Sequence, residues 1–198
     1  MQGREEDGSA SADAHCGFIR SNMETMKAIE QRQSCRSYLG EQISDKDLQT
    51  ILEAANAAPI GGAKFETVKL TVIQNADMLA KINAAAVKAT GNPDIRPTYG
   101  APTVILISAQ IPENQNPSLY CNAACIVENM SLAATDLGLG TVYLLGVMAA
   151  LSADEELCRE LMVPQGFVPV SAMALGKAAA PFKERKLTLS KIATDYVI

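Results

Sequence analysis

Histidine and tryptophan are scarce in this 198-residue chain, and the scarcity of histidine limits the kinds of active site that the chain can form. His15 is the only histidine, and the sequence has no tryptophan. A single histidine excludes most Ser-His-Asp triads, histidine metal sites and histidine-based acid–base schemes. We therefore expect no metal site and no catalytic side chain of this kind. If the chain is an enzyme, a bound cofactor should carry the chemistry.

The number and spacing of the cysteines argue against a protein held together by disulfides. There are five of them, an odd number, without a Cys-x-x-Cys motif or an even disulfide framework. This usage is typical of a reducing compartment, so we expect a cytoplasmic protein. Cys121 and Cys125 lie four residues apart in an apolar segment. We interpret them as small core residues, because a metal or redox pair would need further ligands.

Long apolar runs and an excess of positive charge are both absent. The best membrane candidate, Tyr120 to Leu139, contains Asn122, Glu128, Asn129 and Asp136, so we predict a buried helix instead. The net charge of −5 gives no general attraction to nucleic acid or to an anionic membrane. No Gly-x-Gly-x-x-Gly follows a predicted strand, and no Gly-Lys-Ser/Thr phosphate loop is present. We expect small-molecule partners, no nucleic acid and no membrane.

Composition divides the chain into two parts. Residues 1–22 are small and polar, without periodicity, and are interpreted as a flexible leader. Residues 23–198 are predicted to form a single domain with a C-terminal tail. Apolar periodicity and capping signals predict helices over 23–31, 44–58, 77–89, 120–137, 152–162 (with Ser152 as its cap) and 190–196, and strands over 67–73, 103–109, 141–145 and 168–175. This order predicts one sheet covered on both faces by helices, a three-layer architecture.

Two short cationic segments stand out at opposite ends of the predicted domain. Arg32, Ser34 and Arg36 alternate, so an extended chain would direct all three to one side. Lys183 and Arg185 repeat this spacing near the C-terminus. Guanidinium forks and a hydroxyl suit a phosphate, and the two segments could close on one phosphate from opposite sides. Taken singly, the first segment is better explained as a solvated basic loop and the second as a solvated charged tail; the two together favour a phosphate site.

From residue 23 onward the chain resembles the FMN-dependent nitroreductases. The resemblance rests on the order and spacing of several fragments: METMKAIEQRQSCRSY, ILEAANAAP, TVKLTVI, GAPTVILI, ENMSLAATDLGLGTVYLLG, LMVPQGFVPVSAMALGKA and KERK. It implies an α+β, three-layer α/β/α fold with a central mixed, mostly antiparallel sheet. It also implies a homodimer that binds FMN at its interface.

The resemblance further assigns roles to residues. It implies that Arg32, Ser34 and Arg36 hold the FMN phosphate and ribityl chain, with Lys183 and Arg185 meeting the phosphate from the other end. Leu145 and Gly146 would lie against the isoalloxazine ring. The implied reaction transfers hydride from NAD(P)H to FMN and then reduces a nitroaromatic, quinone or similar acceptor in a ping-pong scheme.

The segment Ile60 to Thr67 departs from the family pattern. Relatives have Ser, Asn, Gln and Pro-Trp after the proline, whereas this chain has Ile-Gly-Gly-Ala-Lys-Phe-Glu-Thr. Lys64 could replace lost polar contacts or lie solvated in a loop, and the Asp frequent at the start of the long helix is Asn122. Two alternatives to a reductase therefore stay open: an FMN-binding protein without turnover, such as a flavin carrier or sensor, and a domain that binds another phosphometabolite.

Overall fold

The computed structural model describes residues 23–112 and 117–198, and its centre is a four-stranded sheet. The strands are β1 (Val68–Ile73), β2 (Thr103–Gln110), β3 (Gly140–Leu144) and β4 (Phe167–Gly176), in the order β1-β2-β4-β3. All three pairings are antiparallel, and a single parallel bridge joins Ser34 to Thr141 at the edge formed by β3. The predicted mixed, mostly antiparallel sheet is therefore confirmed. The predicted leader, residues 1–22, lies outside the described residues.

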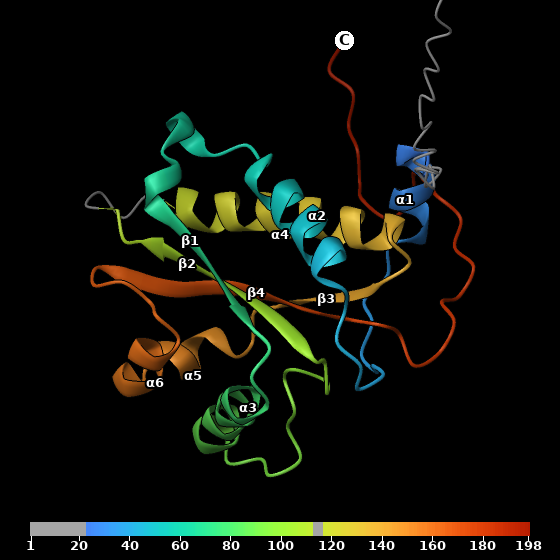
Figure 1. The fold of residues 1–198 in the computed structure, drawn as a ribbon. Coiled ribbons are helices and arrows are strands. Elements are labelled where there is room, and N and C mark those ends of the chain that lie inside the picture. Colours follow the sequence, from blue (N-terminus) through green and yellow to red (C-terminus); the bar gives the residue numbers. More distant parts are fainter. Residues whose placement is uncertain (1–22, 113–116) are drawn as a thin grey trace, which may run out of the picture.

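Helices cover both faces of the sheet (Figure 1). On one face lie α2 (Asp45–Asn56) and α4 (Ser118–Asp136), with α1 (Thr25–Gln31) against α4. On the other lie α3 (Ala76–Thr90), α5 (Met148–Ser152) and α6 (Glu155–Glu160). Two short 3-10 helices, Gly61–Ala63 and Phe65–Thr67, precede β1. This arrangement is the three-layer architecture that the sequence predicted.

The apolar run of β2 explains why this strand is central. Its side chains alternate, so Val104 and Leu106 enter the core beneath α3 and α5, whereas Ile105 and Ile107 enter the core beneath α2 and α4. A strand buried on both faces has no position for a solvated side chain, and only its last residue is exposed. The two cores therefore lie on opposite sides of β2. In the strand order, β3 forms one edge of the sheet.

Capping residues fix the helix ends. The hydroxyl of Ser44 accepts a hydrogen bond from the backbone N–H of Asp47 at 3.1 Å, as its sequence pattern predicted. The prediction that Ser152 caps a helix was wrong. Ser152 is the last residue of α5, and α6 begins after Asp154, whose carboxylate accepts from the N–H of Leu157 at 3.0 Å. Asp caps a helix as well as Ser does, and it stands closer to the apolar residues that α6 buries.

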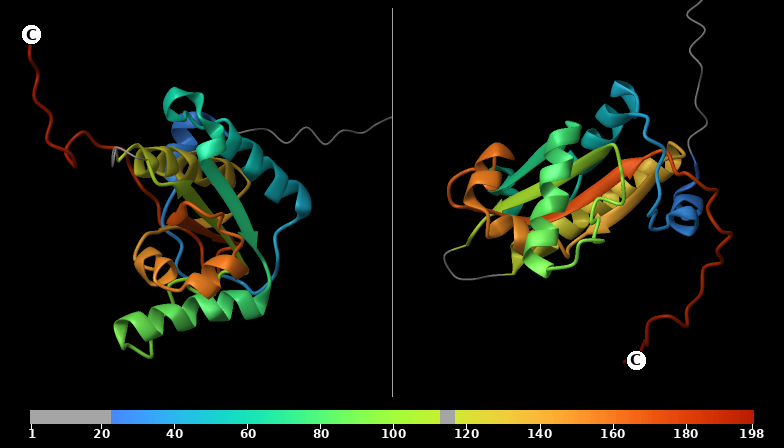
Figure 2. Two further views of the ribbon diagram at one scale, coloured as in Figure 1. Left: turned by 90° about the vertical axis from the view of Figure 1, so that its left-hand side faces the viewer. Right: turned by 90° about the horizontal axis from the view of Figure 1, so that it is seen from below.

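The predicted tail helix, Ser190 to Tyr196, was also wrong. The chain after β4 forms no helix, and its last part, residues 190–198, runs away from the body of the protein (Figure 2). A seven-residue helix needs tertiary packing for stability, and the apolar side chains of this segment are exposed. No helix in the described part of the chain is long and apolar enough to cross a membrane.

Candidate cofactor-binding site

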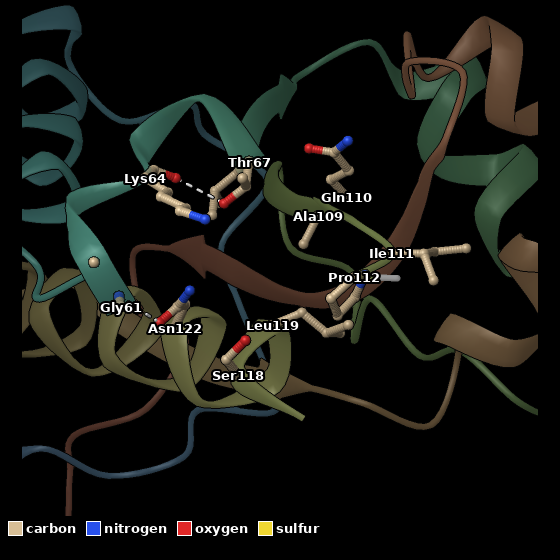
Figure 3. Close-up of a pocket in the computed structure, with 12 residues that line it drawn as sticks. Gly61, Lys64, Thr67, Ala109, Gln110, Ile111, Pro112, Ser118, Leu119 and Asn122 are labelled. Carbon is tan, nitrogen blue, oxygen red and sulfur yellow. Dashed lines mark hydrogen bonds between the residues drawn. The ribbon is translucent and has the colours of Figure 1, made fainter. Parts of the chain in front are cut away.

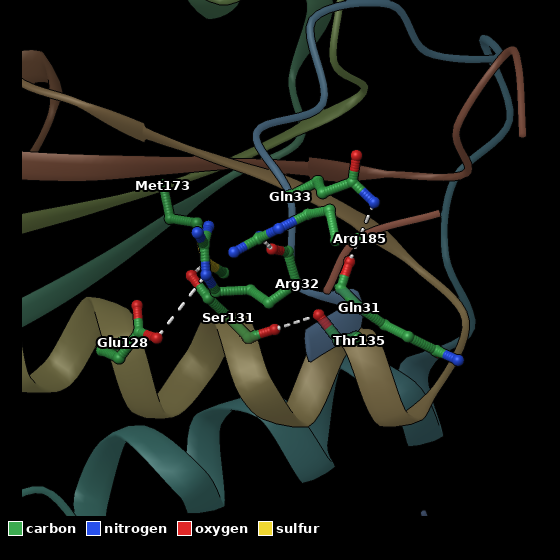
Figure 4. A network of polar contacts seen from close by, with 8 residues as sticks. All are labelled: Gln31, Arg32, Gln33, Glu128, Ser131, Thr135, Met173 and Arg185. Atoms are coloured by element: carbon green, nitrogen blue, oxygen red, sulfur yellow. Dashed lines mark hydrogen bonds and ion pairs between the residues drawn. The ribbon is translucent and has the colours of Figure 1, made fainter. Parts of the chain in front are cut away.

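The two cationic segments lie side by side although they are 150 residues apart in the sequence. The side-chain amide of Gln33 donates a hydrogen bond to the backbone carbonyl of Lys183 at 2.6 Å. The guanidinium of Arg185 donates to the backbone carbonyl of Arg32 (Figure 4). The backbone of Lys183 and the guanidinium of Arg185 therefore lie against Gln33 and Arg32, where α1 ends. Lys183 and Arg185 also line a cavity of about 360 Å³ between α1, the end of α4 and the tail.

Arg32 is positioned by the end of α1. It is the first residue beyond that helix, and its N–H still donates to the carbonyl of Ala28 at 2.8 Å. Its side chain crosses to α4, where Nε lies 3.6 Å from Oε1 of Glu128 (Figure 4). Both side chains are partly exposed, so this ion pair is weak and readily exchanged for a bound anion. Arg32 is thus held near its place while its guanidinium stays available.

The segment after Arg32 lies along β3 as an added edge. Ser34 forms the parallel bridge to Thr141, and the N–H of Cys35 donates to the carbonyl of Thr141 at 2.8 Å. Cys35 is only 6% exposed and faces inward, whereas Ser34 and Arg36 are exposed, as the predicted alternation requires. A Cβ at Gly140 would lie 2.7 Å from the Cys35 sulfur. The close contact between this segment and β3 therefore depends on glycine at position 140.

Tyr38 anchors the end of the same segment. Its hydroxyl donates to the carbonyl of Cys35 at 2.9 Å, and it lies 3.4 Å from the carbonyl of Ala174 on β4. Burial raises the pKa of the Tyr38 phenol well above its usual range. Tyr38 therefore remains a neutral hydrogen-bond donor that ties the cationic segment to the sheet.

A second cavity opens where β3 ends. It has a volume of about 450 Å³ and includes Leu145 and Gly146 in its lining. At about 3.3 Å per residue, Leu145 lies about 13 Å along the strand from Thr141, where Ser34 is bridged. The remaining lining is contributed by α3, the loop before β2, β3 and α5: Ala86, Ala89, Thr90, Ile95, Arg96, Pro97, Tyr99, Tyr143, Leu144, Val147, Ala149 and Ala150. We call this space the strand-end cavity.

Arg36 connects the cationic segment to the strand-end cavity. The central carbon of its guanidinium lies 5.9 Å from the centre of the Tyr99 ring, within the range of a cation–π contact. Tyr99 is part of the cavity wall. Arg32 and Arg36, which the alternating pattern would direct to one anion, therefore have different partners: Glu128 on α4 for Arg32 and Tyr99 for Arg36.

Sequence patterns missed the arginine and the two tyrosines of this cavity: Arg96, Tyr99 and Tyr143. Tyr99 has a φ of +54°, a left-handed conformation that an aromatic residue seldom adopts. In the sequence, the pair Tyr99-Gly100 before β2 was the feature that indicated a turn at this point. Tyr143 was missed because the sequence did not indicate which strand forms an edge of the sheet; β3 is an edge strand, and this side chain is exposed. Strain at Tyr99 is typical of a residue held in place at a functional site.

Solved structures first identify the class of fold. A nitroreductase with bound FMN from Bacteroides fragilis matches 88% of this chain and 100% of its own length, with a TM-score of 0.74 and 28% identity. A nitroreductase with bound FMN from Desulfitobacterium hafniense has a TM-score of 0.76 at 24% identity, with coverages of 87% and 98%. The predicted nitroreductase-like fold is confirmed.

Sequence comparison then gives the family. The Nitroreductase family model matches residues 29–177. A putative NADH dehydrogenase/NAD(P)H nitroreductase of Archaeoglobus fulgidus is 30% identical over 153 residues, which is 77% of this chain and 84% of the relative. The chain belongs to the nitroreductase family. The predicted family and enzyme class, an oxidoreductase, are thus confirmed.

Proposed function

We propose that this protein is an FMN-dependent oxidoreductase that takes a hydride from NAD(P)H and reduces nitroaromatic, quinone or similar acceptors. One observation carries the proposal: two cationic segments, 150 residues apart, close on each other beside a strand that ends at an open cavity. The relatives named as FMN-bound and as NAD(P)H nitroreductases support the choice of cofactor and hydride donor. We further propose that residues 23–198 act as one domain in the cytoplasm.

The residues present fit FMN. Arg32, Lys183 and Arg185 supply cationic donors for a phosphate, and Ser34 supplies an exposed hydroxyl beside them. A Cβ at Gly146 would meet no atom within 4 Å, so the backbone of the strand end is open to a planar ring. Leu145 and Gly146 would lie against this ring, with Arg36 on the same side of the site. FMN supplies the redox chemistry that the protein side chains lack.

The strand-end cavity also supports a ping-pong order of substrates. Its walls combine two tyrosine rings with alanines of α3 and α5, a lining suited to flat apolar molecules. In the proposed order the hydride donor leaves before the acceptor enters. A single cavity of about 450 Å³ beside the bound ring favours this order over binding of both substrates together. Arg36 and Arg96 make the rim positive, which favours electron-rich or anionic substrates.

We also propose that the protein acts as a homodimer. The segment after Arg185 is extended and carries apolar side chains that no part of the described chain covers; Leu189 is 95% exposed. Ile192 and Tyr196 are nearly as exposed. Exposed apolar residues gathered in one segment are typical of a surface that a partner buries. A second copy of the chain is the proposed partner. Light scattering of the purified protein tests this, because the molecular mass distinguishes a dimer from a monomer.

Visible absorption tests the cofactor. The purified protein, or the protein incubated with FMN, should show a flavin spectrum. Arg32→Ala and Arg185→Ala should each weaken FMN binding by roughly 10- to 150-fold, because each removes hydrogen bonds from a charged donor. Since Arg185 contacts the backbone of Arg32, the double variant should lose less than the product of the two effects. Lys46→Met, on the exposed surface of α2, is the matched control and should bind FMN normally.

Turnover separates the proposal from its alternatives. Steady oxidation of NADH or NADPH with menadione and with a nitroaromatic is the expected result. A yellow protein without turnover would identify a flavin-binding protein that is not a reductase. Protein that stays colourless after incubation with FMN would refute the proposal and leave another phosphometabolite as the ligand of the cationic segments.

A further inference from the structure

The chain after β4 runs back along the first cationic segment in the opposite direction. Residues 37–39 pair with residues 177–179 through an antiparallel bridge and two backbone hydrogen bonds of 2.9 and 3.0 Å. In an antiparallel pair, one step back along the first chain corresponds to one step forward along the second. The same register, continued, places Lys183 opposite Gln33. We call residues 177–185 the return segment.

Backbone pairing stops before the return segment reaches Gln33. Within the described parts of the chain, no backbone hydrogen bond joins residues 32–36 to residues 180–185. One reason is Pro181, which has no N–H to donate. Two side chains hold the segments together here instead, those of Gln33 and Arg185.

The amide of Gln33 directs its nitrogen, not its oxygen, toward the return segment. Nε2 lies 2.6 Å from the carbonyl oxygen of Lys183 and 3.4 Å from the carbonyl oxygen of Gln31 (Figure 4). Both neighbours are acceptors, so only the NH₂ group of the amide satisfies them. Alternate residues of an extended chain face opposite sides, so Gln33 faces away from the side shared by Arg32 and Ser34. Its side chain therefore contacts the return segment without taking the place of a bound phosphate.

Lys183 is held by its backbone while its ammonium is left without a carboxylate. Across residues 23–112 and 117–198, no ion pair includes this ammonium. Arg185 differs, because its guanidinium is itself used in the contact with the Arg32 carbonyl. A phosphate that binds Arg185 competes with this contact. The hydrogen bond from Gln33 uses no group that a phosphate would take, so it can hold the return segment both before and after binding.

We propose that Gln33 is a positioning residue, which holds the backbone of Lys183 so that the ammonium meets the phosphate of FMN. The inference rests on the proposed function, because it names the residue that sets one contact of that site. Gln33 acts through Lys183 and does not touch the ligand. Two effects follow: Gln33 keeps the return segment attached, and by doing so it strengthens FMN binding.

Trypsin cleavage of the full chain without added FMN tests the attachment. Trypsin cuts after Lys183 and Arg185 only when the return segment is released, so the cleavage rate follows the released fraction. Gln33→Met keeps the length of the side chain but removes the donor, and loss of this hydrogen bond should raise the rate about fivefold. Gln49→Met is the matched control and should leave the rate unchanged, because Gln49 is exposed and donates within α2.

FMN titration tests the positioning. Gln33→Met should weaken FMN binding about fivefold, and Lys183→Met should weaken it further, because it removes the ammonium itself. In the Lys183→Met background, Gln33→Met should change the affinity by less than about twofold, since the group that Gln33 positions is gone. A merely structural role of Gln33 would give the same factor in both backgrounds. Gln49→Met should bind FMN normally.

Three results would overturn the proposal: an unchanged cleavage rate in Gln33→Met, an unchanged FMN affinity in Gln33→Met, or the full fivefold effect of this substitution in the Lys183→Met background. Circular dichroism spectra and melting temperatures verify that each variant is folded. Faster cleavage of Gln33→Met in a protein that takes up no FMN would uphold Gln33 as the residue that holds Lys183 and would refute FMN as the ligand.

Discussion

Gly140→Ala is predicted to disturb the contact between the cationic segment and the sheet. Gly140 is the first residue of β3 and is buried. An added Cβ would lie 2.7 Å from the sulfur and 2.8 Å from the Cβ of Cys35, and 3.4 Å from the Cβ of Ala178. Real Cβ atoms do not approach this closely. Rotation of the thiol cannot relieve the contact with the Cys35 Cβ, so the backbone of the segment must move.

The size of the effect follows from these contacts. Overpacking of a filled interior costs about 1–3 kcal/mol. Outward movement also lengthens the 2.8 Å hydrogen bond from the Cys35 N–H to the Thr141 carbonyl, which costs about 1 kcal/mol. The sum is about 2–4 kcal/mol of unfolding free energy. For a chain of this length each kcal/mol corresponds to about 2–4 °C, so the melting temperature should fall by roughly 4–16 °C.

Thermal unfolding followed by circular dichroism measures this change, and FMN titration of the folded variant measures whether the displaced segment weakens binding at the proposed phosphate donors. Gly40→Ala is the control, because a Cβ there meets no atom within 4 Å and should shift the melting temperature little. Cys35→Gly removes both clashing atoms, so the double variant should be more stable than the sum of the two single effects. A melting temperature for Gly140→Ala within about 2 °C of wild type, or strict additivity with Cys35→Gly, would refute the reasoning.

Two further substitutions test the local structure. Ser44→Ala should destabilise the protein by about 1 kcal/mol, because the Asp47 N–H loses its capping acceptor; a change in urea midpoint with an unaltered slope is the expected result, and an unchanged midpoint would contradict it. Tyr38→Phe should cost about 1 kcal/mol at neutral pH by removing the hydrogen bond to Cys35. Because burial raises the folded-state pKa of Tyr38 above its usual value of 10.0, stability is retained below pH 10 and lost above it as the unfolded phenol ionises. The difference between wild type and Tyr38→Phe should therefore shrink above pH 10, and a constant difference would contradict this account.

Local signals in the sequence predicted local structure well. The apolar run of β2 and the cap at Ser44 correspond to the structure, because each depends on residues close together in the chain. The failures have equally physical causes. Asp154, two residues after Ser152, is the residue that caps α6. The tail forms no helix because it lacks the tertiary packing that a short helix requires.

The candidate site was predictable only in part. Alternating cations suggested that Arg32 and Arg185 share a ligand, and the structure brings them into contact. The contact of Arg36 with Tyr99 was not predictable, since no spacing relates two residues on separate loops. The hydrogen bond from the Gly61 N–H to the Asn122 side chain (Figure 3) was not predictable for the same reason, because it joins residues 61 positions apart and exists only after folding.

The contact between the two cationic segments has a consequence for how the protein is made. On a ribosome, Gln33 is synthesised 150 residues before Lys183, which accepts its hydrogen bond. At about 5–20 residues per second, this gap corresponds to about 8–30 s of translation. All four strands have been synthesised before the second segment appears. The two segments can therefore meet only at the end of synthesis, and FMN uptake at the proposed site would report that the whole chain from α1 to the tail has been completed.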